Sequence, residues 1–200
     1  MTIIIIVITV IISLLGFSNN ELRHKLLFNA WYIKHENQYW RFITHAFLHA
    51  DFIHLIVNMY VLYSFGRVIE SGYGYYFGHK AYFYYFLLYL GGILFSCVQD
   101  FAKQKDNALF NSLGASGAVS AVVFASILIY PQGSIRFFFI PIDIPNVIFG
   151  LIYLYYSYYM GKRGRGNINH FAHFWGAVFG VVYGFIIKPQ VIISYLSNLL

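Results

Sequence analysis

A serine and a histidine in two different apolar segments are the residues of this sequence best suited to nucleophilic chemistry. Ser116 lies in the short run Gly114-Ala115-Ser116-Gly117, and His173 lies near the start of the last long apolar segment. A serine hydroxyl is a weak nucleophile until a base removes its proton, and a neutral imidazole, with an unperturbed pKa of about 6.5, suits that work. The sequence offers no acidic residue at a matching depth to orient the imidazole, so it predicts a Ser-His dyad rather than a triad.

Other polar residues could stabilise the oxyanion that forms when a serine attacks a carbonyl. The backbone N–H of Ser116 and the side chains of His54 and Asn58 are the predicted donors of this oxyanion hole. Losing one such donor typically costs about 2.7–4 kcal/mol of barrier. His45 and His49 could line a water-retaining pocket that supplies the hydrolytic water.

Each of these patterns also has a simpler explanation. The Gly-x-Ser-Gly run is short, small residues are common where membrane helices meet, and a histidine inside a bundle can be merely hydrogen-bonded. His45 and His49 are four residues apart and could instead face a metal ion. The H-E-x-x-H zinc motif is absent, however, because Ala46 stands in place of the glutamate. We therefore expect no metal and no cofactor.

The composition places these residues in a membrane protein. The chain of 200 residues is 60% hydrophobic and 10% charged, with a mean hydropathy of +0.63, whereas soluble domains are about 45–50% apolar and about 25% charged. A cytosolic enzyme, a disordered tail and a disulfide scaffold are excluded, the last because Cys97 is the single cysteine. The net charge of +6 suits anionic lipid headgroups, and nucleic acid is not an expected partner because no basic stripe with interleaved aromatic residues is present.

Apolar segments of roughly 17–25 residues can cross a bilayer as helices. Six segments qualify or nearly qualify, at residues 3–17, 52–69, 81–98, 115–130, 142–160 and 168–187. Asp51 should cap the second span and Asn167 or Asn169 the sixth. Pro131 and Pro189 should end the fourth and the sixth. The predicted fold is an all-α polytopic membrane bundle of six transmembrane helices, with residues 1–200 forming one membrane domain.

The second, fourth and sixth spans run in the same direction, so their polar groups should meet on one side of the membrane. At a rise of about 1.5 Å per residue, Asn58 lies about 10 Å below its cap and His173 about 6–9 Å below its own. Ser116 comes so early in its span that the preceding loop must dip inward.

Small residues predict how the fourth and sixth spans pack. Gly176, Gly180 and Gly184 recur every four residues, and Gly117, Ala121 and Ala125 share that spacing. Such stripes permit close backbone approach, which would bring His173 toward Ser116. The many tyrosines and phenylalanines of the third and fifth spans are interpreted as lipid-facing packing and interface anchors.

The long connection between residues 18 and 50 is polar and contains several aromatic residues, so we expect it to lie in the membrane interface. Basic residues divide unequally between the two sides of the predicted bundle. One side holds Arg67, Lys80, Arg136 and Lys188, and the other holds Arg23, Lys25, Lys34, Arg41, Lys103, Lys105, Lys162, Arg163 and Arg165. Because cytoplasmic loops are usually the more basic ones, a count of these residues predicts that the N-terminus lies on the outer side of the membrane.

Taken together, the motifs resemble the rhomboid intramembrane serine proteases, in their short six-span bacterial, GlpG-like form. The resemblance covers nearly the whole chain through Trp40-Arg41, His45, His49, His54-x-x-x-Asn58, Gly114-x-Ser116-Gly117 and Ala172-His173-x-x-Gly176-x-x-x-Gly180. It implies that Ser116 is the nucleophile, that His173 is the general base, and that His54, Asn58 and the Ser116 N–H form the oxyanion hole. It also implies that Trp40 and Arg41 belong to an interfacial first loop whose connections Glu70 stabilises.

The resemblance further implies cleavage of transmembrane helices of other proteins near the outer face of a bacterial inner membrane, with those proteins and membrane lipids as partners. It places the N-terminus in the cytoplasm, against the charge count, and we follow it because the first loop carries four of the basic residues and rests on the membrane. Many bacterial relatives have a tyrosine beneath the catalytic histidine where this chain has Ser120, so another group must support the ring or His173 is held more loosely. The alternatives are a non-catalytic rhomboid-like protein that binds client helices and a histidine-lined transporter or metal carrier.

Overall fold

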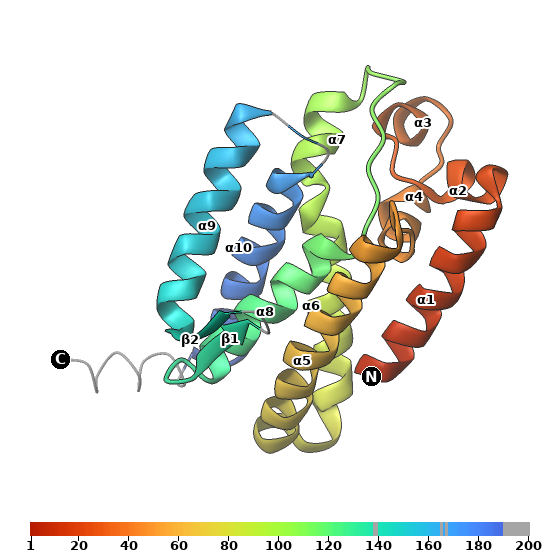
Figure 1. Cartoon of the computed structure of the whole chain (residues 1–200). Coiled ribbons are helices and arrows are strands. Elements are labelled where there is room, and N and C mark those ends of the chain that lie inside the picture. The colour runs from red at the N-terminus through yellow and green to blue at the C-terminus, as the bar shows by residue number, and fades with distance from the viewer. Residues whose placement is uncertain (138–139, 165, 167, 190–200) are drawn as a thin grey trace.

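The computed structural model describes residues 1–137, 140–164, 166 and 168–189, and each predicted apolar segment contains a helix. These helices are α1 (Thr2–Ser18), α5 (Phe52–Phe77), α6 (Ala81–Ser96), α8 (Ser116–Ile129), α9 (Asn146–Arg163) and α10 (His170–Ile187). Figure 1 shows α1 and α9 on opposite sides of the bundle, with α8 between them. Every residue of α8 from Gly117 to Ile127 is buried, against α5, α6 and α10. The helix that begins at Ser116 is therefore the centre of the core.

Two helical segments among the described residues are long and apolar enough to cross a membrane. Phe52–Gln104, which runs through α5, α6 and α7 (Val98–Gln104), contains an 18-residue stretch with a mean hydropathy of 1.7, and the 18 residues of α10 have a mean hydropathy of 1.5. The apolar helices α1 and α8 are shorter, at 17 and 14 residues. The structure is thus mostly helical, and six separate crossings stay a prediction.

The start of the predicted fifth span is wrong. Residues 142–145 belong to strand β2 (Ile140–Pro145), which pairs antiparallel with β1 (Ser134–Phe137), with Ser134 opposite Pro145. Apolar residues alternate with proline or aspartate along β2, and this two-residue period favours a strand over a helix. Pro145 then takes an extended conformation at the N-cap, so that α9 begins at Asn146.

The helix ends follow the capping signals in the sequence. The Asp51 carboxylate accepts a hydrogen bond of 2.8 Å from the backbone N–H of His54, so the predicted cap of α5 is confirmed. Asn169 caps α10 by accepting from Ala172 at 3.0 Å, and Asn167 lies outside the described residues. The helix α5 runs to Phe77, beyond the predicted end at residue 69, and stops at Gly78, whose φ of +54° suits glycine.

The first loop folds into short helices and has its own small core. These are α2 (Asn20–Leu26), α3 (Ala30–His35), α4 (Arg41–Thr44) and the 3₁₀ helix η1 (His45–Phe47). The buried residues Phe28, Ala30, Ile33 and Cys97 form that core, with Phe42, Phe101 and Phe110 packed against them. Phe28 pairs with Ser112 through two backbone hydrogen bonds, which join the first loop to the chain leading into α8.

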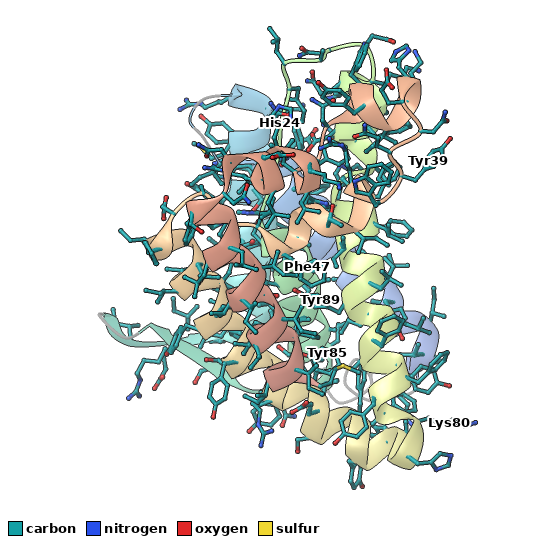
Figure 2. All side chains as sticks on the ribbon, turned by 90° about the vertical axis from the view of Figure 1, so that its right-hand side faces the viewer. His24, Tyr39, Phe47, Lys80, Tyr85 and Tyr89 are labelled. Atoms are coloured by element: carbon teal, nitrogen blue, oxygen red, sulfur yellow. The ribbon has the colours of Figure 1, made fainter. Side chains whose placement is uncertain are left out.

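Figure 2 turns the bundle so that α1 faces the viewer, with His24 and Tyr39 of the first loop at one end and Lys80 at the other. Tyr85 and Tyr89 of α6 lie beside α1 in this view, and both are buried. The hydroxyls of Thr2 and Tyr85 are 3.1 Å apart and hydrogen-bonded. The first helix is therefore part of the packed bundle.

Candidate active site

The loop before α8 brings Ser116 next to the ring of His54. Gly114 has a φ of +126°, a conformation that side chains rarely adopt, and it turns the chain into the helix. A Cβ atom on Gly114 would lie 2.8 Å from Cε1 and 3.1 Å from Nε2 of His54, and 3.8 Å from the Ser116 hydroxyl oxygen. Glycine is thus required here both by the backbone and by the imidazole, and its absence of a side chain lets the ring approach the serine.

The tautomer of His54 follows from its other contact. The backbone N–H of Ala50 donates to Nδ1 of His54 at 3.4 Å. A neutral ring that accepts at Nδ1 carries its proton on Nε2, and Nε2 is the nitrogen that faces Gly114. His54 therefore presents an N–H donor on the side where Ser116 lies.

Asn58 lies one turn further along α5 and is buried. Its amide nitrogen donates to the carbonyl oxygen of His54 at 2.9 Å, so the side chain is folded back along its own helix. This bond holds the amide on the His54 face of α5. One N–H of the amide is used in this bond, and the group carries a second N–H.

Backbone contact between α8 and α10 places His173 near the start of α8. A Cβ on Gly176 would lie 2.0 Å from the carbonyl oxygen of Gly117, and one on Gly180 would lie 2.3 Å from that of Ala121. The carbonyl oxygen of Ala172, the residue before His173, lies 3.3 Å from the corresponding Cβ position of Gly117. Gly184 meets the side chain of Leu128 instead. The small-residue stripes thus bring the helices of Ser116 and His173 together.

No direct hydrogen bond joins the Ser116 hydroxyl to the His173 ring within the described part of the chain. Catalytic hydrogen bonds are often long or poorly aligned in an enzyme without substrate. The His173 ring lies parallel to that of Tyr153 on α9, with centroids 6.5 Å apart and an interplanar angle of 21°. It also meets the His170 ring edge-on at 6.0 Å.

Tyr153 was missed by the sequence reasoning, which assigned the aromatic residues of this segment to lipid. Its hydroxyl is 2.7 Å from the Ser120 hydroxyl, and Ser120 donates to the backbone carbonyl of Ser116 at 2.8 Å. Its ring contacts Phe124 of α8 and Phe149 of its own helix. A contact between Ser120 and a tyrosine 33 residues later in the chain leaves no signal in a hydropathy pattern.

His49 is bonded to protein at both ring nitrogens, and its role in holding water stays a prediction. The Ser13 hydroxyl donates to the carbonyl of Phe47 at 2.8 Å and is 2.9 Å from His49 Nδ1. His49 Nε2 accepts from the backbone N–H of Ala115 at 3.5 Å. Both ring nitrogens are therefore engaged by protein, and the chain of bonds ties α1 to the residue before Ser116. Burial lowers the pKa of His49 to about 3, so the ring is neutral.

His45 is buried as well, and its Nδ1 is 3.0 Å from the carbonyl oxygen of Arg41. Its ring packs edge-on against Phe28, and burial lowers its pKa to about 4. His45 and His49 thus contact different partners. No group of three histidine, cysteine, aspartate or glutamate side chains comes together in a metal-binding arrangement in the described ranges.

Arg41 and Trp40 lie in the first loop and hold its turns together. The Arg41 guanidinium is buried and donates to the carbonyls of His24 and Leu27, at 2.7 and 2.8 Å. The Trp40 indole N–H donates to the carbonyl of Lys25 at 3.2 Å. For Glu70, the loop-stabilising role that the resemblance implied stays a prediction. Its carboxylate accepts from the backbone N–H of Thr2 at 2.8 Å and pairs with Arg67 at 3.0 Å, at the opposite end of α5.

Comparison with known proteins identifies the family. The Rhomboid domain matches residues 36–190. RHOMBOID-like protein 12, mitochondrial, from Arabidopsis thaliana is 31% identical over 152 residues, which cover 70% of this chain and 44% of that protein. Presenilin-associated rhomboid-like protein A, mitochondrial, from Danio rerio is 31% identical over 145 residues, covering 70% and 36%. Rhomboid protein 1, mitochondrial, from Saccharomyces cerevisiae is 29% identical over 150 residues, covering 74% and 42%.

The matched regions thus span less than half the length of these relatives. The relatives are mitochondrial proteins, and the match establishes the family but not the bacterial form that we expected. Rhomboid proteins are integral membrane proteins, in keeping with the apolar helices of this bundle. With more than half of its residues inside the matched domain, the chain belongs to the rhomboid family.

Proposed function

We propose that this chain is an intramembrane serine endopeptidase that hydrolyses peptide bonds in or near transmembrane helices of other membrane proteins. The Ser116 hydroxyl attacks the scissile carbonyl carbon and passes its proton to His173. His173 then protonates the leaving amine, and water releases the acyl group from Ser116 by the same proton transfers in reverse. The observation that carries the proposal is the meeting of Ser116, His54 and Gly114 beside the backbone contact between α8 and α10.

The oxyanion of the tetrahedral intermediate would be stabilised by three donors. The backbone N–H of Ser116 opens α8, where the free N–H groups of a helix favour negative charge. The Nε2–H of His54 faces the same point, and the Asn58 amide lies one turn below it. These groups lie on two elements whose relative position is fixed by the packing of α5 against α8.

The membrane arrangement is also part of the proposal. All six apolar helices cross the bilayer, the N-terminus lies on the cytoplasmic side, and the site opens toward the outer face of a bacterial inner membrane. Transmembrane protein substrates and membrane lipids are the partners. The shared direction of α5, α8 and α10, each of which begins on the side of the first loop, supports a site near one surface.

The decisive experiment is cleavage of a model transmembrane substrate by purified protein in lipid. Ser116→Ala and His173→Ala should each abolish cleavage while leaving the folded bundle intact, and a fluorophosphonate should label Ser116 only while His173 is present. Persistent cleavage by either variant would end the dyad proposal. Binding of substrate helices without cleavage by the unaltered chain would instead favour a non-catalytic rhomboid-like protein.

A further inference from the structure

The imidazole of His173 is flanked by an aromatic ring that comes from a different helix than its own or that of Ser116. Tyr153 lies near the middle of α9, and its ring is nearly parallel to that of His173, at 6.5 Å and 21°. Offset-stacked pairs of this kind have centroids about 4.5–7 Å apart and prefer a defined relative orientation. The contact therefore restricts how the imidazole can turn about its side-chain bonds.

Tyr153 is itself held in place at its polar end. Its hydroxyl and the Ser120 hydroxyl are 2.7 Å apart, and the latter donates to the carbonyl oxygen of Ser116 at 2.8 Å. A continuous path thus runs from the backbone of Ser116, through two hydroxyls, to the ring beside His173. Ser120 lies one turn after Ser116 on α8, so the path ties the Tyr153 ring of α9 to the helix that carries Ser116.

The approach of α9 to α8 makes this path possible. Gly150 lies one turn before Tyr153, and a Cβ on it would lie 3.4 Å from the Phe124 ring of α8. The Tyr153 ring packs against the same phenylalanine, with centroids 5.6 Å apart. Other tyrosines of α9 face outward, and Tyr155 is 71% exposed. Tyr153, in contrast, is a tyrosine of α9 that faces the candidate site.

We propose that Tyr153 is a positioning residue that, with Ser120, aligns the His173 imidazole for proton transfer with Ser116. This inference rests on the proposed protease function and adds to it a residue from α9. A base must stay within hydrogen-bond reach of the serine and then of the leaving amine, so restricting its ring raises the fraction of productive geometries.

The first test separates turnover from affinity. Tyr153→Leu should lower kcat for a transmembrane substrate by about three- to tenfold, the range expected for an aromatic pair, with KM changed by less than about twofold. Tyr153→Phe and Ser120→Ala keep the ring and remove one hydroxyl, so each should lose less. The matched control is Tyr155→Leu, which removes an exposed ring from the same helix and should leave kcat unchanged.

The second test moves the ring to the other helix. In Ser120→Tyr/Tyr153→Leu, the aromatic ring is supplied from α8, and kcat should rise above that of Tyr153→Leu. Any of three outcomes would overturn the inference. They are a kcat of the double variant no higher than that of Tyr153→Leu, a kcat loss in Tyr155→Leu equal to that in Tyr153→Leu, and an unchanged kcat in Tyr153→Leu.

A measurement independent of cleavage keeps the inference apart from the proposed function. The His173 ring signal, assigned by its loss in His173→Ala, should shift in the NMR spectrum of the histidine-labelled protein when Tyr153→Leu removes the ring current, and should stay in place in Tyr155→Leu. Failure of the unaltered chain to cleave would count against the protease proposal alone. An unmoved His173 signal in Tyr153→Leu would count against the positioning role, whatever the activity.

Discussion

Gly176 of α10 and Gly117 of α8 meet backbone to backbone, and a Cβ on Gly176 would lie 2.0 Å from the Gly117 carbonyl oxygen. Gly117 directly follows Ser116, so this contact sets the distance between the two helices at the level of the candidate nucleophile. The oxygen belongs to the main chain of a buried helix and cannot move aside as a flexible side chain would.

Gly176→Ala should therefore destabilise the bundle by about 1–3 kcal/mol, the usual range for overpacking, and should lower cleavage as α8 and α10 move apart. Thermal unfolding in detergent measures the first effect. Gly74→Ala on α5 is the matched control, because a Cβ there meets nothing within 4 Å. Equal stability of the two variants would contradict the close packing.

Asn58→Ala tests the oxyanion hole. The substitution should lower kcat by about a hundredfold or more, since one such donor is worth about 2.7–4 kcal/mol, with a smaller change in KM. Steady-state kinetics on a transmembrane substrate give both values. Ser64→Ala removes an exposed polar group from the same helix, where the hydroxyl donates to the backbone carbonyl of Tyr60, and should change neither value. An effect of Asn58→Ala confined to KM would assign Asn58 to substrate binding.

The buried histidines of the first loop predict loss of stability in acid. Burial lowers the pKa of His45 to about 4 and that of His49 to about 3, whereas each is about 6.5 in the unfolded chain. Between these values the unfolded chain binds more protons, so their stabilising contribution is lost as pH falls below about 6.5. The slope is about 1.4 kcal/mol per pH unit for each histidine.

The pH dependence of chemical unfolding between pH 7 and pH 5 checks this sign. In His49→Gln, the free energy of unfolding should depend less steeply on pH, by the contribution of one histidine, even if the variant is less stable at every pH. His79→Gln, at the end of the bundle away from the first loop, is the control. An unchanged slope in His49→Gln would show that another group causes the acid lability.

Replacing Arg41 with lysine should destabilise the fold of the first loop. Its guanidinium is buried and donates to two carbonyls through Nη1 and to Gln38 through Nε, an arrangement that one ammonium group cannot reproduce. Arg41→Lys should cost about 1–3 kcal/mol, because buried carbonyls lose their donors. Lys25→Ala in the neighbouring exposed helix serves as the control, and the unfolding midpoints of the two variants give the comparison. Indistinguishable midpoints would show that the loop carbonyls find other donors.

The sequence was sufficient to predict the order of the apolar helices and the caps at Asp51 and Asn169, because apolar length and side-chain capping are local properties. It also predicted the approach of α8 and α10, since small residues every four positions leave few other packings. It failed at residues 142–145, where a short apolar stretch was joined to the following helix although its period was two. The contact between Glu70 and the backbone N–H of Thr2 could not be predicted, because Thr2 lies on α1, far away in sequence.

The role of Tyr153 could not be read from the sequence for a different reason. Tyrosine is suited both to a lipid interface and to a protein interior, and α9 carries several tyrosines on all its sides. Which of them turns inward depends on the rotation of α9 against α8, which is fixed at Gly150 and Phe124. The orientation of one helix about its axis is a tertiary property.

The hydrogen bonds of His49 connect the candidate site to a residue that lies before the matched Rhomboid domain. The rhomboid match begins at residue 36, yet the hydroxyl that fixes the His49 tautomer is on Ser13, within α1. A fragment trimmed to the homologous segment would remove this partner of the His49 ring, whose other nitrogen accepts from the N–H of Ala115, the residue before the serine. Shortened versions intended for biophysical work therefore need to keep the leading helix.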